Sequence, residues 1–391
     1  MLKAAQDWGP VANRRPFAVR LMSNTQRVRF KNDMVAQCSF SQAGFEFAVF
    51  RCILEPVLNK PACYTAALYG NHPMTIPVSR RLDFAEIPII DLSATCAGGP
   101  DPATVDAIQK ACTEVGFFYL INHGVAADLI AELVAQGRVF FALPEADKRE
   151  LMLDQRMRGY LPLYYRSYEG EERAGTSHQE GFWIGYDAAL DPRRPLDGPN
   201  HWPSALPQLR RAMLAYLESV EGLSQRMLRL FASALELPVG ALLTNFTMPT
   251  SRLKLNHYPL QQDPVSENNI GVVPHSDSGC FTILWQDDNG GLEVQNQQGD
   301  WVEAPPLADS FVVNIGNILQ YWSNGRFSST PHRVINRHGG DRYSIPFFVN
   351  PDFDTVIRPL ADSVDAGFEA FEYGKYQVDL WRNTFPLANI P

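Results

Sequence analysis

Three residues in the second half of the chain have the types and spacing of a metal site. His275 and Asp277 stand two apart in the stretch VPHSDSGCFTILWQDD, and His332 follows 57 residues after His275. Two imidazoles and one carboxylate on a single face can hold a redox-active iron and leave the opposite coordination positions open. Zinc more often recruits a third histidine or a cysteine. Each residue alone would fit a hydrogen-bonded turn or a buried core histidine, but the three together predict an Fe(II) site.

A second pair of residues begins ten positions beyond His332. Arg342 and Ser344 are two apart in the stretch RYSIPFFVNP, where strand alternation places both side chains on the same side. A guanidinium and a hydroxyl arranged in this way can bind one carboxylate. The following residues are apolar, so the strand is expected to enter the core, where a charge needs a partner. We therefore predict a carboxylate-binding pair beside the metal site; the alternative is an ordinary polar surface strand.

Together these motifs resemble those of the iron(II)- and 2-oxoglutarate-dependent dioxygenases, in the branch that includes isopenicillin N synthase and the plant flavonoid and hormone oxygenases. Further stretches match in the same order from about residue 84 to the C-terminus: IPIIDLS, ACTEVGFFYLINHGV, LKLNHYP, GGLEVQ and FVVNIGNILQYWSNG. The resemblance implies an oxygenase that uses Fe(II), 2-oxoglutarate and O₂ and releases succinate and CO₂. It would hydroxylate, desaturate or cyclise a small molecule, as in secondary metabolism. It also implies that Arg342, Ser344 and Tyr258, from NHYP, bind 2-oxoglutarate.

Two alternative functions are also compatible with these motifs. Isopenicillin N synthase and the ethylene-forming aminocyclopropane oxidase resemble this chain at the same motifs but take no 2-oxoglutarate, so Arg342 and Ser344 would then bind the substrate's own carboxylate. A rival of another class is a non-catalytic barrel that binds a small carboxylate. Such a binder would have no need of three convergent metal ligands.

Substrate choice is expected to depend on aromatic side chains near the mouth of the site. The sequence offers Tyr160 in RGYLP, Phe182 and Trp183 in EGFWIG, and Phe348, which lies four residues after Ser344 on the same strand face. Each of them taken singly could equally be an aromatic residue of the core.

The elements that must position these residues change in type along the chain. Apolar residues at helical spacing predict helices over 101–118, 126–144 and 204–237, with IPIIDLS and YLINHGV as strands among them. From residue 250 onward, short strands separated by turn signals recur every eight to twelve residues, which favours an antiparallel sandwich or barrel. The stretch 367–385 predicts a C-terminal helix that packs across the barrel.

The predicted fold class is α+β with a mainly β core. A jelly-roll barrel with one open mouth would turn His275, Asp277 and His332 inward, with Arg342 on an adjacent strand. The resemblance implies the same architecture, a double-stranded β-helix with an N-terminal helical region. The expected parts are an extension over residues 1–73, an N-terminal dioxygenase region over 84–200, the jelly-roll core over 247–355 and a C-terminal helix over 356–391.

Composition and charge limit the possible partners. The 391 residues are 45% hydrophobic and carry a net charge of −9, which disfavours nucleic acid and anionic membranes. The sequence contains no uninterrupted run of 18 apolar residues, so it predicts no transmembrane helix. We expect a small-molecule substrate, and the sequence leaves the oligomeric state open. The six cysteines have no metal-binding or disulfide spacing, which predicts free thiols in a reducing compartment such as the cytoplasm.

The first 73 residues differ in charge from the rest of the chain. They hold nine Lys or Arg against four Asp or Glu, whereas residues 74–391 hold 25 against 39. One interpretation is a dispensable tail or an over-long gene model, because Met74 opens MTIPVSRRLDFAEIPIIDLS much as members of the family begin. The other is an organellar transit peptide, which would direct the protein to mitochondria.

Overall fold

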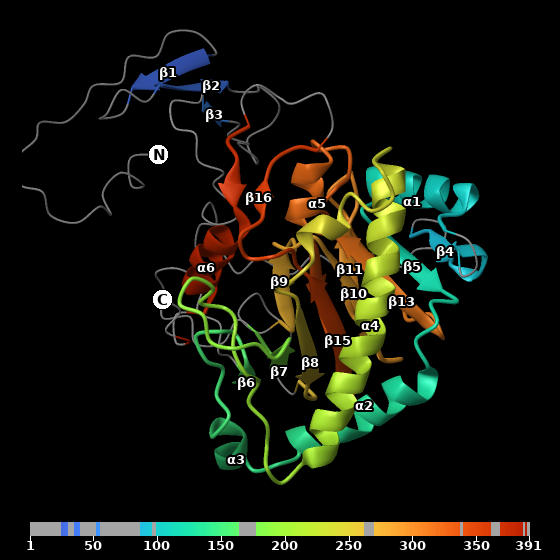
Figure 1. The fold of residues 1–391 in the computed structure, drawn as a ribbon. Helices are drawn as coiled ribbons and strands as arrows, with labels where there is room; N and C mark the ends of the chain where they lie inside the picture. The colour runs from blue at the N-terminus through green and yellow to red at the C-terminus, as the bar shows by residue number, and fades with distance from the viewer. Residues whose placement is uncertain are drawn as a thin grey trace, which may run out of the picture. The chain divides into compact units, whose positions relative to one another are not determined.

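Two units make up the chain, Met1–Ala66 and Ala67–Pro391. The first contains an antiparallel sheet of three strands, β1 (Thr25–Arg29), β2 (Val35–Ser39) and β3 (Cys52–Leu54). The predictions made for the extension 1–73 otherwise lie outside the described residues. Besides the backbone of these strands, the computed structural model (Figure 1) describes residues 87–95, 99–163, 177–261, 270–336, 339–360, 368–385 and 388.

An eight-stranded sheet dominates the second unit. Its strand order is β4-β5-β13-β10-β15-β8-β7-β6, and every neighbouring pair is antiparallel except β4 and β5. The first half of the chain therefore supplies both edges of the sheet and the second half its centre. The strands are β4 (Ile89–Asp91), β5 (Phe117–Ile121), β6 (Gly159–Leu161), β7 (Glu180–Gly185), β8 (Arg252–Tyr258), β10 (Phe281–Gln286), β13 (Ser310–Ile315) and β15 (Arg342–Val349).

A smaller antiparallel sheet has the order β12-β11-β14-β9. The strands after residue 250 thus pair antiparallel, as their turn spacing predicts. In the described part of the chain they belong to separate sheets and form no closed barrel, and β4 to β7 extend the large sheet at both edges. The small sheet consists of β9 (Val272–His275), β11 (Leu292–Gln295), β12 (Trp301–Glu303) and β14 (His332–Val334).

Helices cover one face of the large sheet. The long helix α4 (Pro207–Ala234) contacts α1 (Pro102–Glu114), α2 (Ala127–Phe141) and β15, and Figure 1 shows it running across the strands. Its buried residues recur at helical spacing on one stripe, as Met213, Val220 and Met227 illustrate. None of the described helices combines the length and the apolar character needed to cross a membrane. The shorter helices are α3 (Glu145–Arg149) and α5 (Asn317–Trp322).

The C-terminal stretch is helical over a shorter range than predicted. Helix α6 spans Tyr373–Thr384, and two short strands precede it, β16 (Val356–Ile357) and β17 (Phe371–Glu372). The expected helix over 356–391 is therefore wrong at its start, because the residues of β17 pair with β16 and take up extended backbone. Apolar residues of α6 cluster with Trp183 of β7, which attaches the helix to the edge of the large sheet.

Candidate metal and anion site

Strand alternation divides the large sheet into a helix-covered face and a cavity face. In β8, Leu253 and Leu255 join the core beneath the helices, whereas Lys254, Asn256 and Tyr258 line a cavity. The small sheet supplies the opposite wall of this cavity through β9, β11 and β14. Strand β15 alternates in the same way, with Tyr343, Ile345 and Phe347 in the core and Arg342, Ser344, Pro346 and Phe348 on the cavity.

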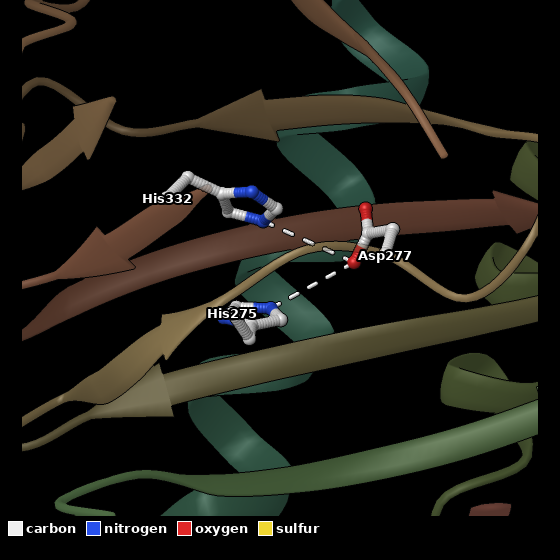
Figure 2. A group of neighbouring side chains, drawn as sticks. All are labelled: His275, Asp277 and His332. Atoms are coloured by element: carbon white, nitrogen blue, oxygen red, sulfur yellow. Dashed lines mark ion pairs between the residues drawn. The ribbon is translucent and has the colours of Figure 1, made fainter. Parts of the chain in front are cut away.

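The structure brings His275, Asp277 and His332 together as the sequence predicts (Figure 2). The two histidines are direct cross-strand partners on β9 and β14, so their rings share one face, with centroids 4.3 Å apart. Asp277 lies in the turn after β9. Its Oδ1 is 3.7 Å from Nε2 of His275 and 3.9 Å from Nε2 of His332. The ligand atoms of all three residues lie within 4.8 Å of one another, so one ion can contact all of them.

Backbone carbonyls orient both imidazoles. Nδ1 of His275 lies 2.9 Å from the carbonyl oxygen of Val273, and Nδ1 of His332 lies 3.3 Å from that of Thr330. A carbonyl only accepts, so each Nδ1 must carry the proton and donate it. In both rings the lone pair is then on Nε2, the atom directed toward Asp277. This tautomer is the one that a metal ion requires.

The Asp277 carboxylate is held by two donors from the large sheet. Its Oδ2 accepts hydrogen bonds from Oγ1 of Thr282 at 2.5 Å and from Nδ2 of Asn314 at 2.8 Å, and these two residues are cross-strand partners on β10 and β13. Burial alone would raise the pKa of Asp277, but His332, His275 and the two donors outweigh it and lower that pKa. Oδ2 is thus occupied, and Oδ1 is left to face the histidines.

The turn that carries Asp277 is fastened to the start of α5. The backbone N–H of Asn317 donates to the Asp277 carbonyl at 2.8 Å, and that of Ile318 donates to Gly279 at 2.9 Å. Gly316 allows this approach, because a Cβ at that position would lie only 2.3 Å from the carbonyl oxygen of Gly279. The close packing of backbone on backbone fixes the position of the carboxylate.

We expect Gly316→Ala to lower the free energy of unfolding by about 1–3 kcal/mol, because backbone atoms must move to admit the methyl group. Chemical denaturation of the variant and the wild type measures the difference. Gly222→Ala in α4 is the matched control, since nothing lies within 4 Å of its added Cβ. Helix propensity predicts that this control raises the stability by up to about 1 kcal/mol. Equal stability of the Gly316 variant and the wild type would contradict the close packing of the turn.

Arg342 is fully buried and lies on the cavity beside the three residues. It is the cross-strand partner of Tyr258, and its guanidinium carbon lies 4.7 Å from the centre of that ring. Nε donates to the carbonyl of Gly290 in the Gly-Gly turn, and Nη2 donates to Oε1 of Gln286 at 3.3 Å. Nη1 is buried without a hydrogen-bond partner among the described residues. A charged donor in that condition is destabilising unless a ligand accepts from it, so the site fits an anion.

Ser344 and Asn256 lie next to this guanidinium. They are also cross-strand partners, and Nδ2 of Asn256 donates to Oγ of Ser344 at 3.2 Å. The hydroxyl of Ser344 accepts this bond and keeps its own proton available for a ligand oxygen. The three residues predicted to bind 2-oxoglutarate, Arg342, Ser344 and Tyr258, therefore line the same cavity as the histidines and the aspartate.

Of the four aromatic candidates for substrate contact, Phe348 is the one that lines the described cavity. Phe182 lies opposite Leu255 and Tyr160 lies opposite Phe182, so both face the helices, where they pack near Phe140. We correct Tyr160 and Phe182 to core residues. The sequence could not separate Phe182 from its neighbour Trp183, because pairing with β8 decides which face of β7 each residue takes. On the cavity side of β7 the aromatic residue is Trp183, opposite Lys254.

Sequence reasoning missed several polar residues around the cavity. Thr282 and Asn314 become neighbours only through the pairing of β10 with β13, and no local motif marks either of them. Gln179 and Lys254 also line the cavity, both nearly fully buried. The available signal was the alternation in LKLNHYP, where Lys254 shares a face with Asn256 and Tyr258.

Comparisons with known proteins decide the family. The model of the 2OG-Fe(II) oxygenase superfamily matches residues 249–351, and that of the non-haem dioxygenase N-terminal region, named from morphine synthesis, matches residues 87–205. The 2-oxoglutarate-dependent dioxygenase citB of Monascus ruber is 34% identical over 303 residues, which cover 73% of this chain and 90% of citB. The chain belongs to the 2OG-Fe(II) oxygenase superfamily.

Solved structures of this superfamily share the fold. A full-length Neurospora crassa protein in complex with alpha-KG superposes with a TM-score of 0.67 at 27% identity, covering 75% of this chain and 95% of the Neurospora chain. JOX2 in complex with 2OG, Fe and JA gives a TM-score of 0.65 at 29% identity, covering 84% of this chain and 94% of JOX2. The protein is an oxidoreductase, a dioxygenase that uses Fe(II), 2-oxoglutarate and O₂. Neither the oxidase that takes no 2-oxoglutarate nor the non-catalytic barrel fits these findings as well.

Proposed function

We propose that His275, Asp277 and His332 bind the Fe(II) ion of this oxygenase, and that Arg342, with Ser344 and Tyr258, binds a carboxylate of 2-oxoglutarate. The observation that carries the proposal is the buried Nη1 of Arg342, which lacks a partner among the described residues and lies on the cavity that the two histidines and the aspartate also line. Three ligands with one negative charge suit a divalent iron, and a fixed guanidinium suits a carboxylate.

Bound Fe(II) and 2-oxoglutarate would supply the oxidising chemistry, in which O₂ oxidises the substrate while 2-oxoglutarate becomes succinate and CO₂. The residues of the chain orient the reactants. Arg342 and Ser344 would fix one end of 2-oxoglutarate so that its other end is presented toward the three metal-binding residues. Apolar side chains from both sheets line the rest of the cavity and exclude water. They are Val272, Leu284, Leu292, Val334, Pro346 and Phe348.

The proposed architecture is a double-stranded β-helix that the two sheets form around the cavity. The superposition on solved oxygenases supports this architecture. The proposed N-terminal region 84–200 is supported by the family match over 87–205, and the proposed core 247–355 by the match over 249–351. We also propose a reducing compartment, the cytoplasm. The buried free thiols Cys112 and Cys280 support it, and the side chains of the other four cysteines lie outside the described residues.

The proposed substrate is a small molecule. The Neurospora crassa protein has been crystallised with thymine and JOX2 with JA. Relatives of 30% identity or more include the 2-oxoglutarate-dependent dioxygenase citB of Monascus ruber and a homoarginine-6-hydroxylase of Glycine max. In this chain Phe348 supplies an aromatic surface on the cavity wall. The experiment is a screen of candidate compounds with purified, iron-loaded protein and O₂, with succinate as the readout. Substrate-dependent succinate that disappears without Fe(II) supports the assignment, whereas product formation without 2-oxoglutarate would contradict it.

We expect Thr282→Val to weaken Fe(II) binding by about tenfold or more, because residues that orient a metal ligand typically contribute 10–100-fold to affinity. The substitution keeps the shape of the side chain but removes a donor to Asp277. Anaerobic competition with a chromophoric chelator measures the affinity. Thr250→Val is the matched control, since its buried hydroxyl donates to the Pro351 carbonyl instead. Equal affinities in the two variants would show that Thr282 does not act through the carboxylate.

A further inference from the structure

A second buried cation lies on the same cavity. Lys254 is 2% exposed and lines the cavity together with Arg342. Among the described lining residues, Asp277 is the carboxylate and these two side chains are the cations. The assignment of iron and 2-oxoglutarate gives roles to Asp277 and Arg342 but leaves Lys254 without one.

Lys254 and Arg342 start from different positions along the sheet. Arg342 lies opposite Tyr258, and Lys254 precedes Tyr258 by four residues, which is about 13 Å along β8. The carbon chain of 2-oxoglutarate has four carbon–carbon bonds and spans at most about 6 Å. The ammonium lies 5.1 Å from the centre of the ring of Trp183, a residue of β7. The two cations therefore enter the cavity at separate points along the sheet, so that one can face the substrate while the other holds 2-oxoglutarate.

Neighbouring residues hold the Lys254 side chain in position on the cavity wall. Its Nζ donates to Oε1 of Gln179 at 3.2 Å, which fixes the direction of the side chain. Gly181 makes room for it, because a Cβ there would lie 2.5 Å from Cε of Lys254. The Trp183 ring stacks on Phe348 with centroids 5.6 Å apart and planes at 16°. A positive charge thus lies beside a stacked aromatic pair, one ring of which faces the cavity.

We propose that Lys254 binds a carboxylate of the oxygenase's substrate, whose flat apolar body lies against Phe348. The inference rests on the proposed function, in which Arg342 is engaged by 2-oxoglutarate. An ammonium forms its strongest hydrogen bonds with carboxylates, and a planar aromatic body complements the exposed face of a stacked ring pair. The substrate class is a small aromatic or unsaturated carboxylic acid.

The test compares acids with their uncharged amides. Anaerobic protein loaded with Fe(II) and saturating 2-oxoglutarate is titrated by calorimetry with benzoate, phenylacetate, 3-phenylpropionate and cinnamate, and with the corresponding primary amides. We expect at least one acid to bind about tenfold or more tightly than its amide, as a charge-assisted hydrogen bond predicts. Lys254→Met should reduce that preference to within about twofold, and Lys254→Arg should retain it.

Matched variants separate this inference from the proposed function. Arg342→Met should weaken 2-oxoglutarate binding and keep the preference for acids when 2-oxoglutarate is saturating. Wild-type protein that binds 2-oxoglutarate but shows no acid preference in any of the four pairs would overturn the role of Lys254 alone. An undiminished preference in a folded Lys254→Met variant, checked by thermal unfolding, would overturn it as well. Wild-type protein that fails to bind 2-oxoglutarate in the presence of Fe(II) would instead overturn the proposed function.

Discussion

Asp277→Ala is expected to abolish turnover and to weaken Fe(II) binding by more than about a hundredfold. The substitution removes the only anionic group among the three proposed ligands. Changing a residue that only orients a ligand typically lowers metal affinity about 10–100-fold, and loss of the ligand itself should have a larger effect. The fold should persist, with a loss of about 1–3 kcal/mol from the unpaired donors Thr282 and Asn314. Succinate formation, metal content and thermal unfolding are measured on the same preparation.

Ser276→Ala is the control for this prediction, because it lies in the same turn and its hydroxyl contacts Asn317 at 3.4 Å instead of the histidines. Its turnover should stay within a few-fold of the wild type. If Asp277→Ala kept both its iron and its turnover, the three residues would not be the metal site of this oxygenase, whatever their proximity.

Arg342→Lys is expected to raise the KM for 2-oxoglutarate by about a hundredfold, with a much smaller change in Fe(II) affinity. Lysine keeps the charge but loses the planar fork that holds a carboxylate through two parallel hydrogen bonds, a difference of about 2–3 kcal/mol. The buried Nη1 is the donor that this change removes. Initial rates of succinate formation at varied 2-oxoglutarate concentration provide the measurement.

Ser344→Ala sets the scale for the arginine variant. It removes a neutral partner from the same carboxylate, so its KM should rise by about tenfold or less. An unchanged KM in Arg342→Lys would mean that Arg342 does not hold the cosubstrate, and the guanidinium would then have to bind the substrate's own carboxylate.

The sequence predicted those parts of the site in which residues lie two apart in the chain. His-x-Asp places two residues around one turn, and Arg-x-Ser places two on one face of a strand, and both arrangements are present. His275 and His332 pair across β9 and β14 although they are far apart in the chain, and only the joint motif pointed to this pairing. By the same alternation His257 lies on the other face of β8 from Tyr258, where its Nδ1 is 2.8 Å from Oε1 of Glu180.

What sequence could not supply is the register between distant strands. Phe182 and Trp183 are adjacent in one aromatic run, and only the pairing of β7 with β8 decides that Phe182 faces the helices. Thr282 and Asn314 meet for the same reason, through a pairing 32 residues apart in the chain. The C-terminal helix was predicted to start before residue 373. Phe371 and Glu372 are compatible with a helix by residue type, but they are extended because they pair with β16.

An anaerobic crystal of the protein with Fe(II) and 2-oxoglutarate, measured at the iron absorption edge, tests the proposed metal and cosubstrate sites. We predict one anomalous peak in contact with Nε2 of His275, Oδ1 of Asp277 and Nε2 of His332, and density for a carboxylate at Nη1 of Arg342. Iron bound elsewhere, or 2-oxoglutarate bound away from Arg342, would contradict it.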